Sequence, residues 1–120
     1  MPSTVVIGGF FGDEGKGKII SYLALHDKPS IVVRGGAGPN AGHTIKDGDK
    51  IYKVRMLPSG FLNKDAKVMV GPGVVVNPSV LLKEINDFDV EGRAFLDLSL
   101  IHISEPTRPR LISYAVFCLK

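Results

Sequence analysis

Short apolar runs alternate with glycine-rich breaks along the first third of the chain. Residues 4–7 form a β-branched run that stops at Gly8-Gly9, which predicts a buried strand entering a glycine turn. From residue 17 to about residue 26, apolar side chains recur at helical spacing and Pro29 follows, so we expect a helix there. Those side chains are Ile19, Ile20, Leu23 and Ala24. Residues 31–33 then predict a second buried strand, and this order is the βαβ pattern of an open parallel sheet, which binds ligands at the carboxyl edge of its strands.

The rest of the pattern predicts a hairpin, a capped helix and two further strands. Residues 44–46 and 51–56 flank an Asp-Gly-Asp turn, which is typical of a hairpin. Residues 67–70 predict a strand, and a Gly-Pro-Gly turn follows it. Asn77-Pro78 offers a helix N-cap with proline at the first helical position, and we expect that helix to end near residue 86 or 87. A last short strand is expected at about residues 93–96.

The first glycine-rich break has the spacing of a phosphate-binding loop. Residues 12–18 read Gly-Asp-Glu-Gly-Lys-Gly-Lys and lie between a predicted strand and a predicted helix, as that motif requires. Backbone N–H groups, the helix amino terminus and a lysine would together bind phosphate oxygens. The Ser or Thr that usually binds magnesium is replaced by Ile19, so Asp13 is the candidate Mg²⁺ ligand. The alternative is a plain tight turn, with Asp13 and Glu14 capping the helix and both lysines in solvent.

A second loop, residues 35–44, is rich in small residues and would leave the second strand at the same edge of the sheet. Its chemical groups are Asn40, His43 and Thr44. A histidine can donate to a developing oxyanion, so His43 facing Asp13 across the two loops would form an acid and base pair. The alternative is that His43 hydrogen-bonds locally and Asn40 only adopts a turn conformation.

Composition and charge limit the class of protein. The chain has 120 residues and 44% hydrophobic residues, which fits one small globular domain. A parallel sheet needs cover on both faces, and so short a chain supplies it only marginally, which hints at incompleteness. Of the net charge of +3, residues 98–120 supply +2 (three basic side chains against one acidic), which leaves +1 for residues 1–97. The basic signal of a nucleic-acid binder is therefore absent from residues 1–97.

Cysteine content and apolar run lengths predict the compartment. Cys118 is the single cysteine, so no internal disulfide can form, and the start lacks the pattern of a secretory signal. No apolar run approaches the roughly 20 residues of a membrane helix. We expect a soluble, cytoplasmic protein with no membrane partner.

Residues 12–18 and the Asn-Ala-Gly-His-Thr sequence at residues 40–44, in that order and separation, closely resemble the adenylosuccinate synthetase family. Residues 57–60 and 71–78 extend the resemblance over roughly residues 4–96. It implies the amino-terminal part of a P-loop-like α/β fold, a mostly parallel sheet with flanking helices, truncated. The family uses GTP to phosphorylate the 6-oxygen of IMP, and the amine of aspartate then displaces that phosphate.

The resemblance also implies roles for individual residues. Asp13 would match the base that removes the purine N1 proton and also binds Mg²⁺, and His43 would match the acid beside the 6-oxygen. The backbone carbonyl of Gly42 would bind the metal. The implied GTP-binding residues are Gly12, Asp13, Glu14, Gly15, Lys16, Gly17, Lys18, Gly42, His43 and Thr44. The implied IMP-binding residues are Asp13, Glu14, Gly15, Lys16, Asn40, Ala41, Gly42 and His43.

The resemblance has limits. Family members are longer homodimers, and their guanine and aspartate sites lie beyond what is present here, so we expect this chain alone to be inactive. Residues 98–120 depart from the family and resemble translated adapter or vector DNA, although a genuine divergent tail stays possible on its apolar content. We expect residues 1–97 to be the amino-terminal portion of the nucleotide-binding domain. The alternative function is a truncated module that binds GTP or phosphate without catalysis.

Overall fold

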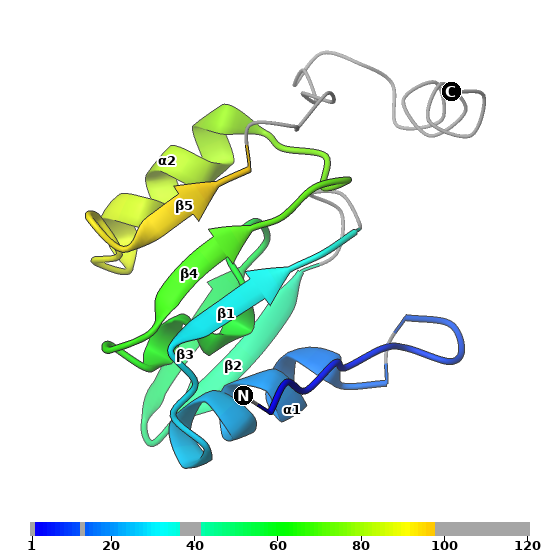
Figure 1. Cartoon of the computed structure of the whole chain (residues 1–120). Helices are drawn as coiled ribbons and strands as arrows, with labels where there is room; N and C mark the ends of the chain where they lie inside the picture. The colour runs from blue at the N-terminus through cyan, green and yellow to red at the C-terminus, as the bar shows by residue number, and fades with distance from the viewer. Residues whose placement is uncertain (1, 13, 37–41, 98–120) are drawn as a thin grey trace, which may run out of the picture.

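The computed structural model describes residues 2–12, 14–36 and 42–97 (Figure 1). Three strands form a parallel sheet in the order β1-β4-β5, and two more form an antiparallel hairpin. The strands are β1 (Ile31–Arg34), β2 (His43–Asp47), β3 (Lys50–Val54), β4 (Lys67–Val70) and β5 (Ala94–Leu96). The sequence-based predictions for Asp13, Asn40, Ala41, Cys118 and the tail at residues 98–120 fall outside the described residues.

Three helical elements accompany the strands: α1 (Lys16–His26), the short 3-10 helix η1 (Ser59–Leu62) and α2 (Pro78–Asp87). In Figure 1, α1 lies on the β1 side of the sheet and α2 on the β5 side. Asn77 caps α2 as predicted, because its side chain accepts a hydrogen bond from the Val80 N–H at 3.2 Å. The predicted α/β class with a parallel sheet, both helices, the hairpin and the later strands are confirmed to within one or two residues.

The hydrophobic core lies on one face of the sheet. Val68 and Val70 of β4 pack there against Ile45 and Val54 of the hairpin and against Leu81 of α2. Each of these five side chains is at most 4% exposed. This packing holds the hairpin, and therefore the start of β2, against the sheet.

The opposite face of the sheet is apolar and open among the described residues. Ile31 and Val33 of β1 are each 52% exposed, and Phe95 of β5 is 45% exposed. The prediction that residues 31–33 form a fully buried strand is therefore wrong for two of the three positions. The reason is the alternation of side chains along a strand, since only Val32 and Arg34 point into the core.

The predicted first strand at residues 4–7 does not form. This segment pairs with no strand in the described part of the chain, and Val5 and Ile7 are 80% and 82% exposed. A β-branched run favours an extended backbone, but a strand also needs a neighbour for its hydrogen bonds and a surface for its side chains. Neither is supplied here, so the prediction is wrong for this structure.

The helix predicted at residues 17–26 is confirmed, but its buried face differs from the expected one. The fully buried positions are Gly17, Ser21 and Ala24, whereas Ile19 is 48% exposed. Small residues are favoured because α1 packs directly on η1. The Ser21 hydroxyl donates to the Ser59 carbonyl at 3.1 Å. No helix in the described ranges has the length and apolar character needed to cross a membrane.

Candidate functional site

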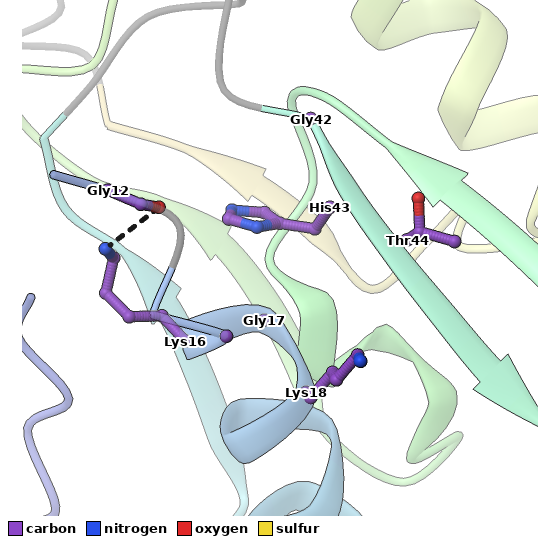
Figure 2. Close-up of a pocket in the computed structure, with 8 residues that line it drawn as sticks. Gly12, Lys16, Gly17, Lys18, Gly42, His43 and Thr44 are labelled. Atoms are coloured by element: carbon purple, nitrogen blue, oxygen red, sulfur yellow. Dashed lines mark hydrogen bonds between the residues drawn. The ribbon is translucent and has the colours of Figure 1, made fainter.

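An open cavity of about 210 Å³ lies between the amino terminus of α1 and the start of β2. It is lined by Gly12, Gly15, Lys16, Gly17, Lys18, Gly42, His43 and Thr44. Figure 2 shows the imidazole of His43 pointing from β2 toward the phosphate loop, with Lys16 and Gly12 facing it. Residues of the two loops, 12–18 and 42–44, therefore meet at one site, as predicted.

The phosphate loop depends on two glycines in the left-handed region. Gly12 has φ 99° and Gly15 has φ 84°, conformations that side chains rarely tolerate. Gly15 is the N-cap of α1, and its carbonyl accepts from the N–H groups of Lys18 at 2.9 Å and Ile19 at 3.2 Å. The helix therefore begins at the cavity and directs its positive end toward it.

The carboxylate of Glu14 accepts hydrogen bonds from the donors of this loop. It accepts from the N–H groups of Phe10 at 2.8 Å and Gly12 at 3.2 Å, and from the Lys16 amine at 2.7 Å. The Lys16 bond, followed by the backbone bonds, lowers the pKa of Glu14 to about 2. Two backbone N–H groups and a lysine around one anion form the donor set that a phosphate needs. The alternative in which Glu14 caps the helix and both lysines lie in solvent is wrong for Glu14 and Lys16, because α1 has no side-chain cap and the two side chains bond to each other.

His43 packs directly against the first turn of α1. A methyl group added at Gly17 would lie 2.9 Å from the Cβ, Cγ and Nδ1 atoms of His43. Burial, and then the positive charges of Arg34 and Lys16, lower the pKa of His43 below its ordinary value. This shift favours the neutral form of the ring, which has one N–H to donate and one nitrogen to accept. His43 thus packs against the phosphate loop, whereas the alternative of a local hydrogen bond stays a prediction.

Two residues near the site were missed by sequence reasoning. Arg34 at the end of β1 is 8% exposed, and Glu84 on α2 is 6% exposed. An arginine that ends an apolar strand and a glutamate on the apolar side of a helix are signals in the sequence, but their pairing across fifty residues is not. Burial lowers the pKa of Arg34, and the negative charge of Glu84 partly opposes this shift.

The structure gathers most of the predicted GTP-binding residues, and Glu14 sits among the loop's donors. Asp13, Asn40 and Ala41 lie outside the described residues, so the Asp13–His43 pair and the IMP contacts stay predictions. Within the described ranges no three His, Cys, Asp or Glu side chains gather closely enough to hold a metal ion.

Comparison with known proteins places this site in a family. The family model described as adenylosuccinate synthetase matches residues 5–109. This chain belongs to the adenylosuccinate synthetase family. It is 57% identical over 97 residues to the adenylosuccinate synthetase of Methanocaldococcus jannaschii, an alignment that covers 78% of this chain and 28% of that protein. It is also 57% identical over 98 residues to the enzyme of Archaeoglobus fulgidus, covering 81% of this chain and 29% of that protein.

A solved structure shares the fold. The fully ligated adenylosuccinate synthetase from Plasmodium falciparum superposes with a TM-score of 0.67 at 38% identity, covering 76% of this chain and 21% of that one. The predicted family, its ligase class and the α/β fold are thereby confirmed. The chain spans less than a third of the length of these three proteins.

Proposed function

We propose that this chain supplies the phosphate-binding part of a GTP-dependent ligase that joins aspartate to IMP through a 6-phosphoryl intermediate. The observation that carries the proposal is the cavity that unites the phosphate loop with the His43 segment. Family membership supports it, because a shared fold alone would leave the reaction open. GTP, IMP and aspartate are the proposed substrates, and a cytoplasmic homodimer is the proposed assembly.

The phosphates of GTP would take over the donors that Glu14 holds. The N–H groups of Phe10 and Gly12 and the Lys16 amine converge on one carboxylate, and α1 begins beside them at Lys16. Donors fixed before the ligand arrives stabilise the charge of a transferring phosphoryl group, which is the main requirement of this chemistry. Glu14 would then turn away and become free to contact the second nucleotide.

A magnesium ion fits the chemistry of this site. The family resemblance assigns Asp13 and the Gly42 backbone carbonyl as its ligands, and Gly42 lines the same cavity as the phosphate loop. Mg²⁺ prefers few protein oxygens together with substrate phosphates, so a cluster of three acidic side chains is not needed. When bound, the ion would neutralise charge on the phosphates.

In the proposed mechanism, Asp13 removes the N1 proton of the purine and the 6-oxygen attacks the γ-phosphorus of GTP, with GDP leaving. The neutral ring of His43 donates its N–H to the 6-oxygen region, and burial beside Arg34 and Lys16 favours that neutral form. The aspartate amine then displaces phosphate from carbon 6. This part of the chain orients and stabilises the nucleotides, and the aspartate site is proposed to lie elsewhere.

The second candidate is a nucleotide-binding module without catalysis. The observation that favours it is the set of phosphate donors around Glu14, which can bind an anion without any further catalytic group. Both candidates require phosphate binding, and they differ in turnover.

Two measurements separate them. Isothermal titration of the full chain with GDP and Mg²⁺ should show binding that Lys16→Met removes, with Lys83→Met on the exposed side of α2 as the matched control. An unchanged affinity in Lys16→Met would contradict both candidates. Addition of GTP, IMP and aspartate, followed by chromatography of the products, then decides: adenylosuccinate supports the ligase, and its absence alongside tight GDP binding supports the module.

A further inference from the structure

A single buried carboxylate holds the segment that follows β3. Glu84 Oε1 accepts from the Arg55 N–H at 2.5 Å, and Oε2 accepts from the N–H groups of Met56 at 3.0 Å and Leu57 at 2.9 Å. Three consecutive backbone donors therefore end on one side chain from α2. Hydrogen bonds to an ionised acceptor are about twice as strong as neutral ones, so this is a firm attachment.

The same segment is held from the other side by Arg34. The Arg34 guanidinium donates to the Arg55 carbonyl, and its positive charge faces the negative charge of Glu84. Both side chains are buried, so each charge depends on the other and on the backbone of Arg55. The peptide groups at Arg55 are thus fixed through both their N–H and their carbonyl.

This attachment point coincides with both ends of the second loop. Arg34 is the last residue of β1, and the loop follows it directly. His43 is the first residue of β2 and pairs with Val54, the residue immediately before Arg55. The start of the loop is therefore linked to Arg55 by the side chain of Arg34. The end of the loop is linked to Arg55 because His43 pairs with Val54, the residue before it.

We propose that Glu84 is a positioning residue that, together with Arg34, fixes both ends of the second loop and so sets His43 against the phosphate loop. The inference rests on the proposed function only where it concerns the action of His43 on a substrate. The claim that Glu84 and Arg34 set the position of His43 is independent of that function. Glu84 does not line the cavity, and it acts through the backbone N–H groups of Arg55, Met56 and Leu57 and through its charge facing Arg34.

A purely stabilising role would not require these residue types. Two buried charges of opposite sign add little stability compared with well-packed apolar side chains of the same volume, because both charges lose their water. A carboxylate that accepts from three successive N–H groups instead fixes the orientation of the backbone at residues 55–57, since each hydrogen bond constrains one peptide plane. The tight contact between His43 and Gly17 makes such a constraint necessary, because a small shift of β2 opens or closes it.

Hydrogen exchange in the full chain tests the inference without any ligand. Glu84→Gln keeps the size of the side chain but removes its charge, and Lys83→Gln on the exposed side of α2 is the matched control. The amides of Val68 in β4 report global opening. Relative to Val68, the amides of residues 43–45 should exchange about tenfold faster or more in Glu84→Gln, the size expected when a charge-assisted hydrogen bond is lost.

Two outcomes would overturn the inference. Equal acceleration at Val68 and at residues 43–45 would mean that Glu84 supports only the stability of the whole fold. Acceleration confined to residues 55–57 would mean that the attachment does not reach His43. Arg34→Met should reproduce the pattern of Glu84→Gln, and the double variant should add little to either single change.

A second measurement connects the position to ligand binding. Affinity for GDP with Mg²⁺ should fall in Glu84→Gln and stay unchanged in Lys83→Gln. Should the wild-type chain bind no GDP, the proposed function fails, while the exchange experiment still decides the positional claim. Full GDP affinity in Glu84→Gln, with β2 demonstrably loosened, would overturn the link between His43 position and binding.

Discussion

Replacing Gly17 by alanine sets two effects of opposite sign against each other. Gly17 lies in the first turn of α1, where alanine is favoured over glycine by about 1 kcal/mol through its lower conformational freedom in the unfolded chain. The new methyl group, however, would lie 2.9 Å from three atoms of His43, whereas ordinary contacts begin at 3.4 Å. The distance between the new methyl group and His43 must therefore grow by about 0.5 Å, which requires one of the two loops to move.

Rotation of the imidazole does not relieve this overlap. One of the three contacts is to the Cβ atom of His43, which moves only with the backbone of β2. Overpacking of this kind costs about 1–3 kcal/mol, so the contact outweighs the helix propensity. We expect Gly17→Ala to lower the free energy of unfolding by about 1 kcal/mol and to weaken nucleotide binding.

Urea unfolding followed by circular dichroism measures this change. Gly9→Ala is a suitable control, because no atom lies within 4 Å of a methyl group at that position. In a His43→Gly background the obstructing atoms are gone, and Gly17→Ala should become neutral or stabilising. A Gly17→Ala chain that is more stable than wild type, in the original background, would refute the packing argument.

Three further predictions concern separate parts of the structure. Arg93 donates to three backbone carbonyls of the turn before β4, so Arg93→Met should lower the free energy of unfolding by about 2 kcal/mol, and an unchanged urea midpoint would contradict this. Asn77→Ala removes the cap of α2 and should cost about 1 kcal/mol in the same assay, whereas the exposed Asn86→Ala should cost nothing measurable. Because the folded pKa of Glu14 is depressed to about 2 from 4.5, its loop contacts should persist above pH 4.5 and be lost as the pH falls toward 2. Carboxyl NMR titration should show this midpoint, and Lys16→Met should raise it; a wild-type midpoint at 4.5 would disprove the interaction.

The elements that sequence reasoning predicted well are those with local causes. The cap at Asn77, the turn between β2 and β3, and the apolar run of β4 each depend on a few neighbouring residues. The strand at residues 4–7 failed because pairing is decided by a partner far along the chain or outside it. For the same reason, the sequence predicted that the two loops meet but not that a buried Glu84 fixes their geometry.

The buried face of α1 was also beyond the pattern of apolar residues. A hydrophobic stripe predicts large side chains at an interface, but here the distance between α1 and η1 is too short for them. A methyl group at Gly60 would lie 2.8 Å from Val32 and 3.0 Å from Ala24. Close approach of two backbones selects glycine, serine and alanine, and a scale of hydrophobicity does not register that preference.

The open face of the sheet suggests an order of events during synthesis. Every side chain of the main core comes from the contiguous stretch of residues 45–90, so this layer can close as soon as that stretch has left the ribosome. Ile31 and Val33 would meanwhile remain in contact with water or with a chaperone. The chain thus carries its own folding nucleus on one face of the sheet and an exposed apolar surface on the other.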